Sequence, residues 1–371
     1  MGCGRLPQPG RCDRGSEMTS TPRYWRIRPQ AAMRPRVSGS HQAVLTENTK
    51  CVIKYANALS KRGILRCSCR GCLRVTCIAT DLGGGQTYAL SNPFALDGRV
   101  STHPGRARGW APMQSYLILE KDAALLVDTG FSVHADALVA ALRDRLAPGV
   151  VLSVLSLRIG DYSANANVRP LAEQLQVGDY YGTFAESVSW GDVLPEYGSF
   201  GGPIGGGALR GFRHAKIGNS NPEALYVGSA GRELEIFAAP LRLLPGFWAY
   251  DAATLTLFTS DVFGEVWRDT PAGPWHTVAG DPAPSSTHTW DVLVSGRYWW
   301  LSGARTTTLR EQLANIFERY DVESIAPAFG CVIRGRDRVR AELESLMAAL
   351  EFAEHQPQDG IAVGREARVL T

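Results

Sequence analysis

The chain has 371 residues, of which 44% are hydrophobic and 20% are charged, and its net charge is +3. This composition is typical of a globular protein that can bury a large core. The sequence contains no run of about 18 or more apolar residues, so we predict no transmembrane helix. The N-terminus also lacks the apolar core of a secretory signal. We therefore expect a cytoplasmic protein without a membrane partner.

The N-terminal fifth of the chain differs sharply from the rest. Residues 1–77 contain 15 of the 39 Lys and Arg residues, only 3 of the 36 Asp and Glu residues, and 7 of the 8 cysteines. We predict that residues 1–75 are a basic extension that is disordered or not native. Organelle targeting stays open, because an excess of Arg with few acids is typical of transit peptides. Nucleic-acid binding is not expected, since no zinc-finger or helix-turn-helix pattern accompanies the arginines.

The first half of the body alternates short apolar runs with one amphipathic helix. Leu138, Ala141 and Leu142 share one face at helical spacing, which predicts a helix over residues 134–146 that covers a sheet. A second helix is expected at 165–175. The predicted strands are residues 75–79, 86–90, 115–120, 124–128 and 150–155. Residues 115–128 are therefore expected to form a hairpin.

The second half contains two stretches without clear periodicity, residues 178–232 and 264–302, which we interpret as irregular insertions. Between and after them the patterns return. Strands are predicted at 233–239, 247–249, 254–258 and 324–326, and helices at 308–320 and 336–354. We expect one domain over residues 76–356, followed by a tail at 357–371.

Four segments of the body form an ordered set of motifs: residues 126–130 (Leu-Val-Asp-Thr-Gly), residues 156–165, residues 240–261 with Pro-Gly and Leu-Phe-x-x-Asp, and residues 325–330. In their order and separation they resemble landmarks of the metallo-β-lactamase fold. The pattern is most similar to the branch of flavodiiron proteins and related oxygen-binding di-iron proteins. The resemblance implies an α/β protein with a four-layer αββα sandwich.

The same resemblance implies positions for metal ligands, and most of these positions carry other side chains. They are occupied by Leu157, Ile159, Tyr162, Leu243 and Phe329. Only Asp161 and Asp261, which approach the second metal in the family, remain. Leu, Ile and Phe offer no donor atom to a metal. We therefore predict no metal cofactor, with Zn or Fe bound only if unconventional ligands such as His103 contribute.

Two neighbouring carboxylates without a cation repel each other, and this raises the pKa of one of them. Asp161 and Asp261 are thus candidates for a general acid and base, with Tyr162 as a hydrogen-bond donor. The competing interpretation is an inert ion pair with Arg158 or Arg242. The surrounding pocket is predicted to involve Asp128, Asn165, Arg158, Arg242, Leu157, Ile159, Leu243, Phe247, Trp248 and Phe329.

Three functions follow from these residues. The favoured one is a metal-free protein of this fold that binds a small-molecule ligand or is non-catalytic. The second is a metal-independent enzyme that uses Asp161 and Asp261 on a small-molecule substrate. The third is a metal-dependent hydrolase or di-iron oxidoreductase with displaced ligands. A homo-oligomer is compatible with each of them, and the sequence does not identify the ligand.

Overall fold

The computed structural model describes residues 76–158, 162–182, 211–214, 223–243 and 246–356. All of them belong to one compact unit, Cys72–Thr371. The basic extension predicted for residues 1–75 and the tail predicted for 357–371 lie outside the described residues. None of the helices in the described part combines the length and apolar character that a membrane crossing requires.

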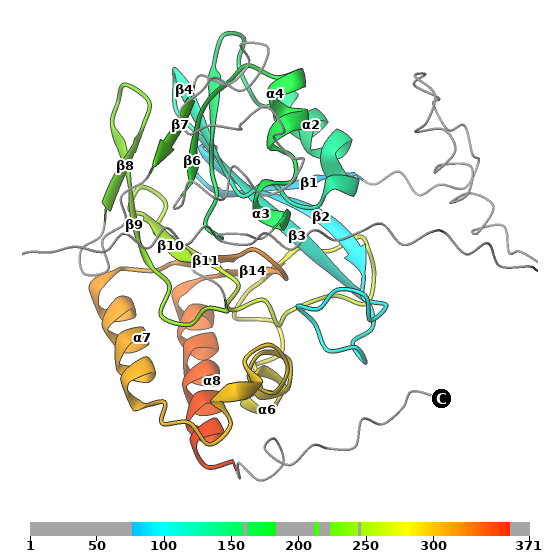
Figure 1. Ribbon diagram of the computed structural model, residues 1–371, viewed down its shortest axis with the longest axis vertical. Helices are drawn as coiled ribbons and strands as arrows, with labels where there is room; N and C mark the ends of the chain where they lie inside the picture. Colours follow the sequence, from blue (N-terminus) through cyan, green and yellow to red (C-terminus); the bar gives the residue numbers. More distant parts are fainter. Residues whose placement is uncertain (1–75, 159–161, 183–210, 215–222, 244–245, 357–371) are drawn as a thin grey trace, which may run out of the picture. The chain divides into compact units, whose positions relative to one another are not determined.

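The first sheet contains seven strands in chain order (Figure 1). They are β1 (Ile78–Gly83), β2 (Thr87–Ala95), β3 (Trp110–Leu119), β4 (Ala123–Val127), β5 (Val151–Leu155), β6 (Val177–Gly182) and β7 (Gly211–His214). Strands β1 to β4 pair antiparallel, whereas β4 to β7 pair parallel. Because β4 and β5 are parallel neighbours, the residues that follow them meet at one edge of the sheet.

The second sheet has the order β12-β14-β13-β11-β10-β9-β8. Its strands are β8 (Glu223–Val227), β9 (Arg232–Ala238), β10 (Phe247–Asp251), β11 (Thr256–Ser260), β12 (His276–Thr277), β13 (Ser324–Pro327) and β14 (Val332–Arg334). Every residue of the central strands β10, β11 and β13 is buried. Since β11 and β13 are parallel, their carboxyl ends also meet at one edge.

Helices cover the outer face of each sheet (Figure 1). The α-helices are α2 (Ala135–Arg143), α3 (Tyr162–Asn165), α4 (Val168–Gln174), α6 (Ser286–Thr289), α7 (Thr307–Arg319) and α8 (Arg336–Glu354). Two 3₁₀ helices, η1 (Ser132–His134) and η4 (Trp299–Leu301), and a π-helix, η3 (Trp290–Arg297), complete the set. Helices α2 and α4 lie over the first sheet, and α7 and α8 lie over the second.

Three apolar layers hold these four layers of secondary structure together. Leu138 and Leu171 pack between α2, α4 and the first sheet. Tyr116 and Phe258 meet edge to face between the two sheets, with ring centroids 5.2 Å apart. Leu313 pairs with other apolar residues of α7 and α8 beneath the second sheet. The architecture is therefore an α/β four-layer sandwich, which confirms the predicted fold class.

The two stretches predicted to be irregular contain regular elements, and this corrects the sequence analysis. Strands β6, β7 and β8 are short and lie within residues 177–227. Strand β6 pairs with β5 and β7, which are distant from it in sequence, whereas β8 pairs with β9, the next strand in the chain. Residues 264–302 contain β12, α6 and the π-helix η3. Their order comes from tertiary contacts: Thr289 of α6, for example, hydrogen-bonds the hydroxyl of Ser345 on α8. Such contacts leave no local period in the sequence.

Smaller differences concern element ends. The helix predicted at 165–175 is two helices, α3 and α4, separated at Ala166 and Asn167. The Asn167 side-chain amide donates to the carbonyl oxygen of Thr129 at 2.7 Å, so this break anchors the loop that follows β4. Strand β14 was not predicted, and β2 runs five residues further than expected.

Candidate functional site

The ends of four strands, β4, β5, β11 and β13, bring the predicted site residues together. Asp128 follows β4 in the first sheet, with a positive φ of 55°. Its backbone N–H donates to Leu155, and its carboxylate accepts from the N–H of Leu157 at 3.0 Å. Asp261 and Phe329 follow β11 and β13 in the second sheet. The site is thus built at the edge where both sheets end.

Arg158 takes the central position among these groups. It is only 2% exposed. One guanidinium nitrogen lies 3.3 Å from a carboxylate oxygen of Asp128, and the other lies 3.3 Å from one of Asp261. The guanidinium carbon lies 5.1 Å from the ring centroid of Phe329. Arg158 therefore joins the carboxylates of the two sheets and contacts an aromatic ring, a geometry that suits the planar guanidinium.

A second arginine reaches the same carboxylate from the π-helix η3. Arg297 places a guanidinium nitrogen 2.8 Å from the second oxygen of Asp261, and its guanidinium carbon lies 5.9 Å from the Phe329 centroid. Charges alternate along these four residues, from Asp128 through Arg158 and Asp261 to Arg297. We call this set the charge row. The sequence analysis did not identify Arg297, because no local pattern connects it with Asp261.

The described residues of this site do not fit a zinc or di-iron centre. Leu157 and Phe329 are buried and carry no donor atom. Arg158 and Arg297 already present two positive charges to Asp261, and a divalent cation placed beside them would be repelled. No group of three or more His, Cys, Asp or Glu residues in the described part of the chain is arranged to hold a metal ion.

Several predicted site residues lie elsewhere or outside the described part. Asp161 and Ile159 fall outside it, and so does the side chain of Tyr162, whose backbone begins α3. Asn165 ends α3 and is buried. Helix α3 is tied to the site, because the carbonyl oxygen of Ala164 accepts from the N–H of Thr129 at 2.9 Å.

The structure corrects the predicted positions of two side chains in the segment before β10. Arg242, expected as a partner of the carboxylates, is exposed and donates to the carbonyl oxygen of Ala239. Leu243, expected to fill a former ligand space, is 47% exposed. The nearby backbone does reach the site, because Arg158 pairs with Gly246. It is therefore the main chain of this segment, not these two side chains, that adjoins the charge row.

Phe247 and Trp248 do not line one pocket together. Successive side chains of a strand point to opposite faces. Phe247 accordingly packs between the two sheets, whereas Trp248 packs beneath α7 and α8. The prediction of a shared aromatic pocket is corrected by this alternation.

His103, the candidate for an unconventional ligand, is buried among aromatic rings. Its ring lies edge-on to Phe94 and to Trp267, with centroids 5.9 and 5.5 Å apart. Its Nδ1 lies 2.9 Å from the hydroxyl of Thr102. Burial, and then the positive charge of Arg297, lower the pKa of His103 to about 4. The imidazole is therefore neutral at pH 7, and its charged neighbour is a cation.

Comparison with known proteins gives a result at the level of fold. No family model matches the sequence, and no curated protein matches it either. Rubredoxin oxygen:oxidoreductase from Desulfovibrio gigas superposes with a TM-score of 0.54 and 15% identity, over 76% of this chain and 63% of that one. The metal-soaked flavodiiron core from Synechocystis sp. PCC6803 superposes with a TM-score of 0.51 and 17% identity, over 73% of this chain and 61% of that one.

A mutant flavo di-iron protein from Thermotoga maritima gives a TM-score of 0.51 with 13% identity, over 77% of this chain and 64% of that one. The chain therefore spans less than two thirds of the length of these three proteins. Its fold is that of the metallo-β-lactamase-fold di-iron proteins, as the four sequence segments predicted.

Proposed function

We propose that this chain is a metal-independent protein built on the metallo-β-lactamase fold, and that it binds a small molecule without metal-dependent chemistry. The observation that carries the proposal is the position of Arg158 between Asp128 and Asp261, at 3.3 Å from each. In this interpretation the guanidinium supplies the positive charge that a metal would otherwise bring to these carboxylates.

The energetic reason is that a buried carboxylate needs a cation or hydrogen-bond donors. Asp128 and Arg158 have side chains only 4% and 3% exposed, so water does little to stabilise either charge. An arginine remains charged at every physiological pH and can contact two carboxylates at once. The charge row contains two negative and two positive groups, and a dication added to it would break an existing ion pair.

The same contacts favour binding over acid–base catalysis by Asp261. One carboxylate oxygen lies 3.3 Å from Arg158 and the other 2.8 Å from Arg297. A proton transfer at either oxygen would weaken an ion pair in a nearly dry environment. Phe329 closes the side of the row on which both guanidinium groups lie. This arrangement supports a structural role for Asp261.

The test is the metal content of the full-length protein, purified without a chelator and without a His tag. We expect no stoichiometric Zn, Fe or Mn. We also expect an unchanged Tm when Fe²⁺ or Zn²⁺ is added after chelation, because an ion that binds only the folded state raises the Tm. A stoichiometric metal that disappears in Asp261→Asn would overturn the proposal, and Glu344→Gln on the exposed side of α8 is the matched control.

A further inference from the structure

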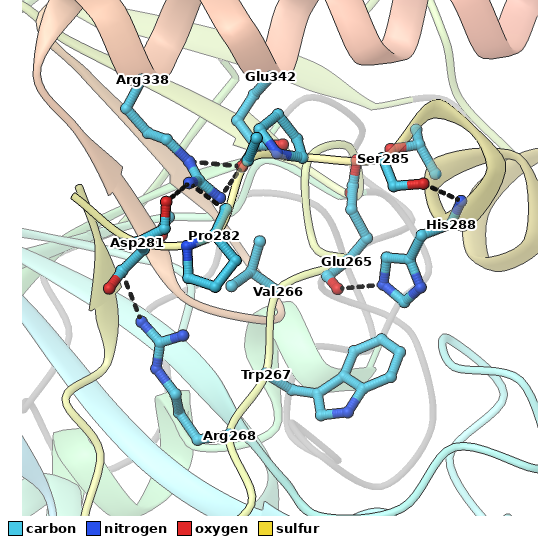
Figure 2. Close-up of a pocket in the computed structure, with 14 residues that line it drawn as sticks. Glu265, Val266, Trp267, Arg268, Asp281, Pro282, Ser285, His288, Arg338 and Glu342 are labelled. Carbon is cyan, nitrogen blue, oxygen red and sulfur yellow. Dashed lines mark hydrogen bonds and ion pairs between the residues drawn. The ribbon is translucent and has the colours of Figure 1, made fainter. Parts of the chain in front are cut away.

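A separate cavity of about 350 Å³ lies between α8 and the segment that follows β11. Its wall is formed by Glu265 to Arg268, by residues 281–289 leading into α6, and by Arg338 and Glu342 of α8 (Figure 2). Figure 2 shows Glu265 and His288 next to each other, with Trp267 on one side and Arg338 and Glu342 on the other. None of these residues belongs to the charge row.

The two arginines that line this cavity each form an ion pair with a carboxylate other than that of Glu265. Arg338 pairs with Glu342 at 2.7 Å, and Arg268 pairs with Asp281 at 3.2 Å. Glu265 is only 3% exposed, and within the described part of the chain neither of its carboxylate oxygens has a hydrogen-bond partner. A buried polar group without partners is costly, so a ligand that supplies a partner for Glu265 would be stabilised beside it.

The electrostatics of Glu265 show which sign of charge the cavity accepts. Burial, and then the negative charge of Glu342, raise the pKa of Glu265 to about 8, whereas its own backbone N–H and the Thr289 hydroxyl act to lower it. That hydroxyl is itself engaged with Ser345 at 3.0 Å. Burial also raises the pKa of Glu342, although Arg338 opposes the rise. A cation entering the cavity would stabilise both carboxylates.

Aromatic rings form a second wall beside Glu265. The rings of Trp267 and His288 lie 5.0 Å apart. The Nε2 of His288 lies 3.0 Å from the carbonyl oxygen of Glu265, which can only accept, so this nitrogen carries the hydrogen and the ring is held in place. Val266, Pro282 and other apolar groups complete the lining. An indole face is the aromatic surface that binds cations best.

We propose that this cavity binds a small organic ammonium ion, with Glu265 as its counter-ion and Trp267 as the aromatic wall against its apolar part. The inference rests on the proposed small-molecule binding function and names its ligand class. It does not depend on the charge row, so metal content and ammonium binding are separate tests.

The experiment is isothermal titration of the full-length protein at pH 8.5, where Glu265 is mostly ionised and benzylamine is still mostly protonated, with benzylamine and with benzyl alcohol, its neutral analogue of similar shape. We expect saturable binding of benzylamine, and at least ~10-fold weaker binding of benzyl alcohol, because a charge-assisted hydrogen bond is lost. Glu265→Gln should weaken benzylamine binding by a similar factor, whereas Glu344→Gln should not change it.

Absence of saturable benzylamine binding would overturn the inference, and so would equal binding of the alcohol or unaltered binding by Glu265→Gln. The comparison of the two probes uses the unmodified protein, so it decides the question even if the variant does not fold. If ammonium binding is found together with a stoichiometric metal, the cavity stands and the metal-independent function fails. If the protein is metal-free and does not bind ammonium, the metal-independent function stands and the cavity proposal fails.

Discussion

Asp261 and Glu265 are four residues apart in the segment that follows β11, and their side chains are largely shielded from water, but their surroundings differ completely. Asp261 contacts two guanidinium groups, those of Arg158 and Arg297. Glu265 has no cationic partner within the described residues, because the nearby Arg338 and Arg268 are engaged by other carboxylates.

This difference indicates how a folded chain treats a buried negative charge. A charge that the protein neutralises with its own cations is part of the core, and its removal costs stability. A charge without such a partner lowers stability and provides a place for a ligand. Two predictions test whether the two carboxylates belong to these two classes, and a third tests how dry the surroundings of the charge row are; they begin with the largest expected effect.

Arg158→Leu should destabilise the protein by about 3–5 kcal/mol, because it leaves the carboxylates of Asp128 and Asp261 buried with at most one cation between them. The free energy of unfolding from urea titrations measures the effect. Arg340→Met is the control, since Arg340 is 70% exposed and its ion pair with Asp337 spans 3.8 Å. Such a surface pair contributes little.

Adding Asp261→Asn to Arg158→Leu should recover part of the lost stability, since one unpaired charge is removed. If Arg158→Leu were as stable as the unmodified protein, the charge row would not be the structural substitute for a metal that we infer.

Glu265→Gln should stabilise the protein at high pH and have little effect at low pH. The pKa of Glu265 is about 8 in the folded state against an ordinary value of 4.5. Between these values the folded state holds a proton that the unfolded state has lost, so stability falls as pH rises through this window. We expect a gain of about 2–4 kcal/mol at pH 8.5 and almost none at pH 4.5.

Thermal unfolding of both proteins across this pH range is the measurement. The charged neighbours Glu342, Arg338, Asp281 and Arg268, as well as His288, are the same in both proteins and cancel in the difference. A difference that does not depend on pH would show that Glu265 is not the carboxylate that titrates in this window.

His103→Phe should give a smaller effect of the opposite sign with pH. The pKa of His103 is about 4 in the folded state against an ordinary 6.5, so the unfolded state alone binds a proton between these values. The unmodified protein therefore loses stability as pH falls through this window. The variant should be more stable by about 1–2 kcal/mol at pH 5 and similar at pH 7.

Parallel unfolding curves of His103→Phe and the unmodified protein at pH 5 and pH 7 would show that His103 does not titrate beside Arg297. In that case the end of the charge row near η3 would be less dry than the packing of Phe94 and Trp267 around His103 indicates.

Much of the fold could be predicted because its signals are local. The periodicity of residues 134–146 and 336–354 predicted helices α2 and α8, and the apolar runs predicted the central strands. The short strands β6 and β7 were missed because their stability comes from pairing with strands distant in the sequence, and β8 and β14 were missed because their few residues carry little local signal.

The candidate site was predictable only in part. Asp128, Leu157, Asp261 and Phe329 were placed together by their positions in family-like segments, and the structure brings them to one edge. Arg297 and Glu265 were missed because a π-helix and a long connection carry them, and no sequence period marks either one. Leu243 and Arg242 were misplaced because their segment adjoins the site through its backbone.

The sequence by itself determined which atoms are available: positions 157 and 329 carry hydrocarbon side chains in any conformation, and hydrocarbon does not ligate metals. The central strands and the longer helices were likewise predictable from local hydrophobic periods. Only the tertiary structure decided which cation meets which carboxylate, because such pairs join residues far apart in the chain. The Arg158–Asp261 contact spans 103 positions, and the low exposure of the two side chains, 3% and 13%, gives the pairing its energetic weight.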